Sequence, residues 1–562
     1  MAKAKTQQKN GSKPKANKKL VTLPEIFTGA GFTPIETDGI HFEVAGRTGE
    51  IDFIFSYKNV VVICEETTGM NGVSAHFSKK KLFHEILTDN RAEFYKIYCE
   101  KNNDFEKYVN EGEYEAEDLE MRHIYFSSAM DCDASLYTHS NPLKIMKRAD
   151  ANYFKSLAKT IGKSSKYELL KYLGVSLAQV GDTKASGAKV SSLGYDTFVL
   201  SGNHINYPTG FGVVSFYADP ASLISRAYVL RRDGWEDAQI SYQRFLVPVK
   251  LASMRKYLAE TRKVFVNNLI VTLPNHVQII NNKTNTPVDL SGTFKGNAML
   301  TLPEELGTVG IIDGQHRVFS YYEGEDSAES AIKNLRKRQN LLVTGIVFPD
   351  DYTDFQRVKF EAELFLSINN TQTGVKADLR QELEALINPA STISICKAVI
   401  SALAKSGPLS GFLQESLYDP PEKIRTSSLV RYVLPSLLKT DGQGSLYSLF
   451  SPNADADLED DISRSAYIQF CQEKINLVLL SLRTQLQQKW KPRHKGEVGI
   501  LSPTSIGGFL LMLRDIINGY DSPFGFDFDK QLEGIASFPF ESYTSSAWAQ
   551  VGAALAAQFF DC

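Results

Sequence analysis

The sequence predicts a mixed α/β protein with two α/β units and a helical C-terminal region. Strand-like apolar runs occur before residue 130 and again between residues 200 and 350, and they fade beyond residue 385. Of 562 residues, 43% are hydrophobic and 23% charged, which is the balance of a folded globular chain. We expect a basic tail at 1–20, an α/β domain at 21–140, a helical connector at 141–200, a second α/β domain at 201–385 and a helical region at 386–562.

The tail holds much of the positive charge. Residues 1–20 contain seven lysines and no acid, whereas the whole chain has a formal net charge of −3. So polar a segment cannot bury a core, and we expect it to be disordered. Lys13, Lys15, Lys18 and Lys19 are candidate DNA contacts that would act by counterion release, and a purely solubilising tail is the alternative.

Cysteine usage and hydropathy predict a reduced, cytoplasmic protein without a membrane partner. The six cysteines form no CxxC pair or Cys/His cluster, so we expect neither a disulfide framework nor a zinc site. No apolar run approaches the ~20 residues that span a bilayer. The basic N-terminus lacks the apolar stretch of a signal peptide.

The first α/β unit places acidic residues on two neighbouring strands. Its expected elements are a helix at Leu23–Gly31, strands at Glu50–Tyr57 and Asn59–Cys64, helical spacing at Phe77–Cys99 and a strand at His123–Phe126.

Side chains along a strand alternate between faces, so Glu50 and Asp52 should point the same way. Asp52 and Glu65 could then lie side by side at the open end of an apolar hairpin. Paired carboxylates suit a hard cation such as Mg²⁺ or Mn²⁺. Such an ion generates a nucleophilic hydroxide and stabilises charge on a phosphoryl group.

This order of elements resembles the PD-(D/E)xK nuclease fold of restriction endonucleases over roughly residues 21–130. The resemblance implies that Asp52 and Glu65 are metal ligands, with Glu50 as an accessory ligand. Thr67 stands where that family has the lysine that orients or activates the attacking water.

Two explanations for Thr67 remain open. The lysine could have moved to the following helix, where Lys79, Lys80 and Lys81 cluster near His76. Alternatively, the domain is an inactive nuclease-like fold that only holds DNA. An unrelated hairpin with surface acids is a third interpretation.

The second α/β unit carries the other chemical motif. We expect strands at Phe211–Tyr217, Leu269–Leu273, Val309–Ile312 and Leu341–Phe348, and helices at Leu246–Glu260 and Asp354–Ser367. The strand that ends at Ile312 runs directly into the segment Asp313-Gly314-Gln315-His316-Arg317.

In this segment Gly314 allows a tight turn, and Asp313 is a good helix N-cap. His316 and Arg317 add donors that could hold a nucleotide or DNA phosphate. The alternative is a capped helix in which Asp313 and Arg317 form an i, i+4 surface pair.

The five residues match, in order, the signature of the DGQHR-domain (DndB-like) proteins within the ParB/sulfiredoxin-like group. The resemblance covers about residues 200–385 and implies nucleotide-phosphate binding by Gly314, His316 and Arg317. Gln315 stands at the position of the sulfiredoxin cysteine, so peroxide repair is not expected. Further candidate residues of the nucleotide site are Asp313, Gln315, Gln243, Arg244 and Asn369.

Together the two resemblances imply a DNA-acting protein of a DNA-modification or anti-phage defence system. It would nick or cleave DNA with Mg²⁺ or Mn²⁺, gated by ATP or another nucleotide at the DGQHR motif. The alternative is a DndB-like DNA-binding regulator with an inactive nuclease-like domain. Expected partners are DNA, nucleotide and other proteins of the same operon, and a homo-oligomer is compatible with the sequence.

Overall fold

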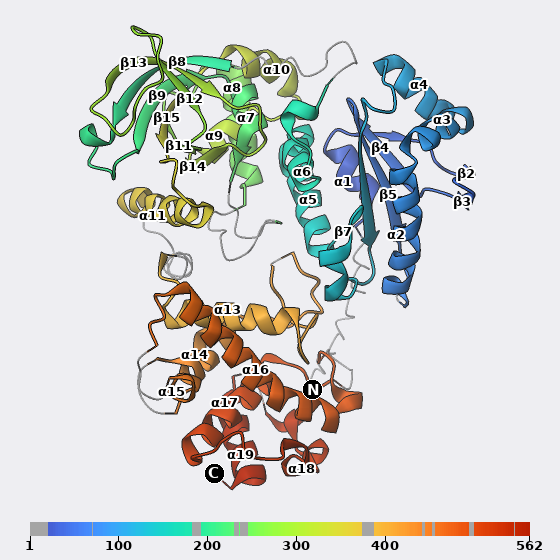
Figure 1. Cartoon of the computed structure of the whole chain (residues 1–562), viewed down its shortest axis with the longest axis vertical. Helices are drawn as coiled ribbons and strands as arrows, with labels where there is room; N and C mark the ends of the chain where they lie inside the picture. Colours follow the sequence, from blue (N-terminus) through green and yellow to red (C-terminus); the bar gives the residue numbers. More distant parts are fainter. Residues whose placement is uncertain are drawn as a thin grey trace, which may run out of the picture.

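The computed structural model comprises an N-terminal α/β unit, a central α/β unit and a helical C-terminal region (Figure 1). One apolar core runs through the first two units, and a separate core fills the third. The mixed α/β class and the helical C-terminal region agree with the sequence-based expectation. The structure describes residues 21–69, 71–181, 193–229, 235, 245–373, 387–416, 418–440, 444–451, 456–493, 499–543 and 546–561.

The N-terminal unit is built on a five-stranded sheet of order β1-β4-β5-β6-β7. Strands β1, β4 and β5 are antiparallel, whereas β5, β6 and β7 run parallel. Lys58 takes a positive φ of 54° in the tight turn between β4 and β5. The strands are β1 (Thr33–Ile35), β4 (Phe53–Tyr57), β5 (Val60–Thr67), β6 (Glu120–Ser127) and β7 (Leu143–Met146), beside a small hairpin of β2 (Phe42–Val44) and β3 (Arg47–Gly49).

Helices cover both faces of this sheet because its strands are apolar on both sides. Val62 and Cys64 pack with α1 (Leu23–Gly29) and α5 (Arg148–Ile161) on one face. Val61 and Ile63 pack on the opposite face, where α2 (Val73–Asp89) lies. Helices α3 (Arg91–Lys101) and α4 (Asn103–Gly112) extend that second layer. The side chains of β5 therefore alternate between the two helical layers, as the sequence predicts.

Three differences from the sequence-based expectation affect the candidate site and the domain borders. Strand β4 begins at Phe53, so Glu50 and Asp52 lie in the connection before it rather than on a strand. The helical stretch Phe77–Cys99 is two helices, because the chain leaves helical geometry at Asn90. The segment 141–200 is not a separate connector: β7 joins the N-terminal sheet, α5 packs on α1, and β8 already belongs to the central sheet from Leu193.

The central unit contains an eight-stranded mixed sheet of order β10-β14-β11-β15-β9-β8-β13-β12. Its strands are β8 (Leu193–Ser201), β9 (Gly212–Ala218), β10 (Ala227–Tyr228), β11 (Leu269–Leu273), β12 (Gln278–Asn281), β13 (Lys295–Leu302), β14 (Val309–Asp313) and β15 (Leu341–Val347). Its helices are α7 (Pro220–Arg226), α8 (Pro248–Thr261), α9 (Gln315–Phe319), α10 (Glu329–Arg338) and α11 (Asp354–Thr373).

Helix α5 and the following α6 (Lys166–Tyr172) lie between the two α/β units (Figure 1). The ammonium group of Lys166, nearly buried, is 2.8 Å from both carboxylate oxygens of Glu323, and the Lys163 amide donates to the Glu323 carbonyl at 2.9 Å. Arg148, at the start of α5, forms an ion pair of 2.7 Å with Glu422 of the C-terminal region. The N-terminal unit is thus tied to both of the others.

The regular secondary structure of the C-terminal region consists of helices. A Cβ on Gly508 would lie 2.3 Å from Val551, and a Cβ on Gly552 would lie 2.7 Å from Leu511. The two glycines therefore allow the helices that carry them to pack closely. None of the described helices has the length and apolar character needed to cross a membrane. The helices are α13 (Thr392–Lys405), α14 (Leu434–Leu438), α15 (Leu446–Phe450), α16 (Asp461–Gln485), α17 (Pro503–Gly519), α18 (Phe528–Gln531) and α19 (Trp548–Phe560).

Candidate functional site

Asp52 and Glu65 meet at the end of the β4–β5 hairpin. Phe53 pairs with Cys64 across the two strands, and Asp52 and Glu65 are the next residues along. The Glu66 amide donates to Asp52 Oδ2 at 2.8 Å, which fixes the Asp52 side chain at the edge of β5. Burial raises the pKa of Asp52, and the neighbouring Glu65 charge raises it further. Asp52 is therefore close enough to Glu65 for the Glu65 carboxylate to oppose the ionisation of Asp52.

Glu65 is completely buried, and a lysine and a histidine from α2 contact it. Lys80 Nζ is 2.5 Å from Glu65 Oε2, and His84 Nε2 is 3.1 Å from Oε1. Burial raises the pKa of Glu65, and the Lys80 ammonium opposes that rise. Glu65 is thus a buried carboxylate with one cationic partner, supplied by helix α2 rather than by strand β5.

One face of α2 carries the polar side chains that point at the sheet. His76, Lys80 and His84 are spaced i, i+4, i+8 and therefore share a face. His76 Nδ1 lies 3.0 Å from the hydroxyl oxygen of Tyr125 on β6. Lys79 is exposed, and Lys81 donates instead to the His139 carbonyl at 2.7 Å. Of the three adjacent lysines, only Lys80 reaches the carboxylates.

A second buried histidine extends this group away from the carboxylates. His84 Nδ1 is 2.7 Å from His123 Nδ1, so one ring donates the proton and the other accepts it. Burial and the Lys80 charge lower the pKa of His84 to about 3. Burial likewise lowers the pKa of His123, so both rings are neutral near pH 7. Neither histidine was a candidate from the sequence, although the i, i+4 spacing from Lys80 indicated His84.

Glu50 does not join the predicted metal site. Its side chain is 60% exposed and lies 3.6 Å from His41 Nδ1. The physical reason is that β4 begins after Asp52, so the strand alternation that would align Glu50 with Asp52 is absent. Across the described residues, no three His, Cys, Asp or Glu side chains form a metal-binding group.

The donor set still fits Mg²⁺ or Mn²⁺ with Asp52 and Glu65 as the two side-chain ligands. Mg²⁺ commonly binds one or two carboxylates and keeps several waters or substrate phosphate oxygens. Glu65 Oε2 is buried and has the ion pair with Lys80 but no hydrogen bond of good geometry. Coordination of a cation by this oxygen would require the Lys80 ammonium to move aside.

Glu66 serves the opposite face of the sheet. Its Oε2 accepts a hydrogen bond of 3.1 Å from the Leu23 amide at the start of α1. Burial raises the pKa of Glu66 to about 7. Glu66 therefore fixes α1 to the strand that carries Glu65, a role the sequence analysis did not assign.

The DGQHR segment forms the turn from β14 into the short helix α9. Gly314 has a φ of 102°, and a Cβ there would lie 2.4 Å from Leu269 Cδ2. The positive φ favours glycine here, and a side chain would also displace the Leu269 methyl group. The N-cap of α9 is Gly314 rather than Asp313, because β14 continues through Asp313, and the predicted N-cap role of Asp313 is wrong.

Arg317 is already paired within this turn. Its Nη2 is 2.7 Å from Asp313 Oδ2, which is the i, i+4 pair of the alternative interpretation. His316 Nε2 accepts a hydrogen bond of 3.1 Å from the Val247 amide, so His316 joins the turn to the start of α8. Gln315 lies half-buried in the first turn of α9.

Several predicted site residues lie outside what the structure describes. These are Gln243 and Arg244, the tail lysines Lys13, Lys15, Lys18 and Lys19, and the side chain of Asn369, whose backbone belongs to α11.

A buried acid lies near the DGQHR strand. Glu361 of α11 is fully buried, and its Oε1 accepts hydrogen bonds from the hydroxyls of Thr272, at 2.5 Å, and Tyr228. Thr272 and Tyr228 lie on β11 and β10, the strands that flank β14. This polar cluster fixes α11 against the sheet, and no sequence motif marked it.

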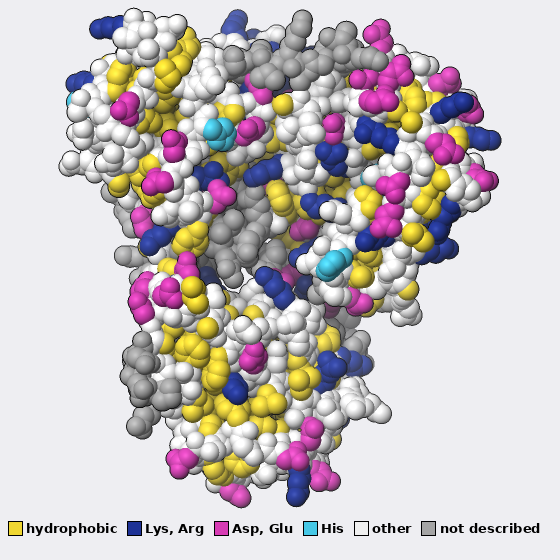
Figure 2. Space-filling view, in the orientation of Figure 1, with side chains coloured by type: hydrophobic (Ala, Val, Ile, Leu, Met, Phe, Trp, Pro, Cys, Tyr) yellow, Lys and Arg dark blue, Asp and Glu magenta, His cyan; other side chains and the backbone are white. Residues whose placement is uncertain are grey.

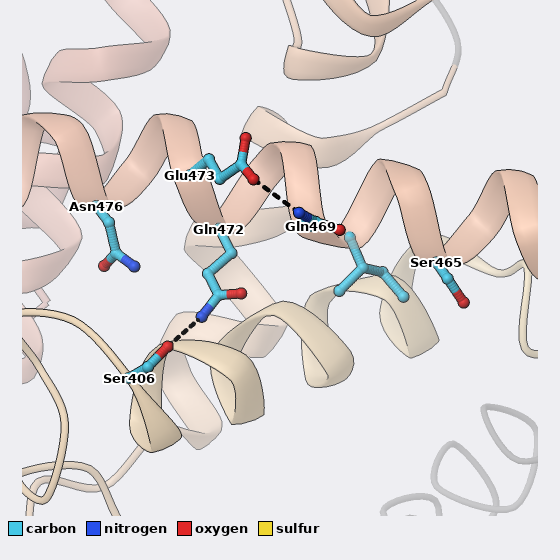
Figure 3. Close-up of a pocket in the computed structure, with 7 residues that line it drawn as sticks. Ser406, Ser465, Gln469, Gln472, Glu473 and Asn476 are labelled. Atoms are coloured by element: carbon cyan, nitrogen blue, oxygen red, sulfur yellow. Dashed lines mark hydrogen bonds between the residues drawn. The ribbon is translucent and has the colours of Figure 1, made fainter. Parts of the chain in front are cut away.

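A polar pocket in the C-terminal region and the charged surface of the α/β units are weaker candidates for a functional site. A shallow pocket between α13 and α16 is lined mainly by amide and hydroxyl groups, with Gln472 donating to Ser406 at 2.7 Å and Gln469 to Glu473 at 2.8 Å (Figure 3). It holds no cation or pair of acids for chemistry. Figure 2 shows Lys and Arg intermixed with Asp and Glu over the α/β units, so this face presents no surface of a single charge sign.

Comparisons of the chain with protein-family models, with curated proteins and with solved structures find no match.

Proposed function

We propose that the N-terminal unit is a DNA nickase or endonuclease that requires Mg²⁺ or Mn²⁺, with Asp52 and Glu65 as cation ligands and Lys80 in the lysine role. The observation that carries this proposal is the 2.5 Å contact between Lys80 Nζ and Glu65 Oε2 beside Asp52. This contact brings together two acids and a lysine from three separate segments, and metal-dependent phosphodiester hydrolysis needs these residue types.

In this mechanism the cation supplies Lewis acidity at the scissile phosphate and lowers the pKa of water. Lys80 has three N–H donors and uses one side of the ammonium on Glu65. The remaining donors orient the attacking water or stabilise a phosphoryl oxygen. His84 holds Glu65 Oε1, which keeps the carboxylate from rotating away from Asp52.

The DGQHR turn is our proposed nucleotide site. A bound phosphate, from ATP or another nucleotide, would compete with Asp313 for the Arg317 guanidinium, and the geometry of Gly314 lets a ligand approach the backbone. Through this competition nucleotide would gate the nuclease. By its resemblances, we assign the protein to a cytoplasmic DNA-modification or anti-phage defence system, acting with other proteins of that system.

One observation favours the alternative of a DNA-binding regulator with an inactive nuclease-like domain. Glu65 is fully buried, and both carboxylate oxygens already have a partner within 3.1 Å. A cation can bind there only if Lys80 moves aside. The alternative predicts DNA binding without cleavage.

Nicking of supercoiled plasmid by Lys80→Met and by Lys79→Met tests the proposal. Both variants lose one positive charge from the same helix, but Lys79 is exposed and makes no contact with the carboxylates. We expect Lys80→Met to lose ~100-fold or more in rate and Lys79→Met to remain within about twofold of wild type. Equal rates for the two variants would remove Lys80 from the mechanism.

A further inference from the structure

A second pocket opens at the C-terminal end of α2, beyond the Lys80–Glu65 pair. Its volume is about 570 Å³, within the range typical of small-ligand sites. It lies where the end of α2, the start of α3, strands β6 and β7 and the end of α6 come together. The residues that line it are Thr88, Arg91, Met121, Arg122, His123, Ile124, Asn141, Pro142, Lys144 and Leu173.

The charged side chains that line this pocket all have the same sign. Arg91, Arg122 and Lys144 are cations, and no acid lines the pocket. Arg122 is 3.1 Å from Glu120, whose side chain lies outside the lining. A concave surface with three cations and no carboxylate concentrates positive potential, which favours an anion.

Two of these cations have hydrogen-bonding capacity left over. Arg91 Nη2 donates to the Leu119 carbonyl, but its Nε is buried without a hydrogen-bond partner. The Lys144 ammonium donates to the Tyr172 carbonyl and lies 3.9 Å from the centre of the Tyr172 ring. Burial lowers the pKa of Lys144, and the nearby Asp150 carboxylate opposes this shift only in part. A bound anion would satisfy Arg91 Nε and compensate Lys144.

The uncharged lining narrows the class of ligand. Met121, Pro142 and Leu173 provide apolar surface beside the cations, while Thr88 and Asn141 add polar side chains. We propose that this pocket binds a small phosphate-bearing molecule of mononucleotide size, with the phosphate on Arg91 and Lys144 and the nucleoside part against the apolar lining.

The pocket also contacts the carboxylate site through two histidines. His123 lines the pocket, its Nδ1 is 2.7 Å from His84 Nδ1, and His84 Nε2 is 3.1 Å from Glu65. A ligand that shifts the His123 ring therefore changes how Glu65 is held. This consequence, an effector role for the ligand, rests on the proposed nuclease function, whereas ligand binding itself does not.

Isothermal titration calorimetry of the full-length protein with pyrophosphate and with AMP, in the absence of DNA and divalent cations, tests the pocket. We expect Arg91→Gln and Lys144→Gln each to weaken binding roughly tenfold, the worth of one charge-assisted contact. Lys96→Gln, an equal charge change at an exposed position on α3, should bind as wild type does. Arg317→Gln should also bind normally, which separates this pocket from the DGQHR turn.

The result that overturns the proposal is wild-type binding of neither probe at millimolar concentration, or equal binding by wild type and both pocket variants. Loss of binding in Arg317→Gln alone would move the ligand to the DGQHR turn and equally overturn it. Hydrogen exchange on the wild-type protein provides a measurement that needs no variant. Ligand should slow exchange in β6 and around Asn141 but not in the C-terminal helices, and the absence of local slowing contradicts the pocket.

The calorimetric result stands whether or not the protein cuts DNA. Binding without any plasmid cleavage supports the pocket and refutes the nuclease. Cleavage without binding supports the nuclease and refutes the pocket.

Discussion

The Lys80–Glu65 pair should dominate the local stability of the N-terminal sheet. Glu65 is 0% exposed and Lys80 18% exposed, so replacing Lys80 by methionine leaves a buried carboxylate without its cation. Removing one partner of a buried pair costs about 3–5 kcal/mol when both charges are fully buried. Because Lys80 is partly exposed and Glu65 can take up a proton, we expect a loss of about 2–3 kcal/mol at pH 7 for Lys80→Met.

Amide hydrogen exchange of the full-length protein measures this loss where it occurs. Opening of β5 and α2 should become about 30- to 150-fold more frequent in Lys80→Met, since 1.36 kcal/mol corresponds to a factor of ten. Lys79→Met, its exposed neighbour, should change exchange less than twofold. In the double variant Lys80→Met/Glu65→Gln most of the loss should disappear, because no buried charge remains to be compensated.

Additive losses of stability in the single and double variants would refute this prediction. If the losses from Lys80→Met and Glu65→Gln simply add in the double variant, the two side chains are not coupled, and the lysine role of Lys80 fails with them. A loss of the same size in Lys79→Met would refute the assignment equally well.

Three further predictions concern other contacts. Burial raises the Glu66 pKa from 4.5 to about 7, so the folded state holds this proton more tightly than the unfolded state, and stability falls as pH rises from 4.5 to 7. Glu66→Gln should flatten that fall by about 3 kcal/mol at most when the free energy of unfolding is measured at pH 5 and pH 8. An unchanged pH profile in the variant would contradict the prediction. Gly314→Ala should cost about 1–3 kcal/mol of stability in thermal unfolding, because residue 314 has a φ of 102° and its Cβ would lie 2.4 Å from Leu269 Cδ2. A change below about 0.5 kcal/mol would contradict this and show that the turn can relax. Arg255, 1% exposed, binds Asp326 and Glu329 at 2.7–3.0 Å. Because both acids are partly exposed, Arg255→Met should lower stability by about 1–3 kcal/mol and speed exchange in α10. Unchanged exchange in α10 would contradict the contact.

Local patterns in the sequence predicted the central strands β4, β5 and β6 of the first unit and β9, β11, β14 and β15 of the second, but not the remaining strands of either sheet. Leu269–Leu273 is a strand with the bounds expected, and the alternation Val61/Ile63 against Val62/Cys64 fills two different layers. Such strands are apolar on both faces, and the pattern is visible without knowledge of the neighbours. The break at Asn90 and the extension of the N-terminal unit through α5 depend on packing between distant segments and were not predictable.

The candidate site was predictable only in part. Motif order brought Asp52 and Glu65 together and limited the lysine to three neighbours, but only the helix orientation selects Lys80 over Lys79. His123 is separated by 39 residues from His84, so no local spacing could link them. Glu50 was misplaced because a shift of three residues in the start of β4 removed the alternation on which the prediction depended.

The central claim is cation-dependent DNA cleavage at Asp52. The direct measurement is the nicking rate of supercoiled plasmid by wild type and Asp52→Asn, in Mg²⁺, Mn²⁺ or EDTA, with and without ATP. Asparagine keeps an oxygen to accept the Glu66 amide but loses the charge that binds the cation. We predict nicking by wild type with either cation, none in EDTA, and a loss of ~100-fold or more in Asp52→Asn. DNA binding without nicking under every condition, or equal nicking by both proteins, would contradict the account.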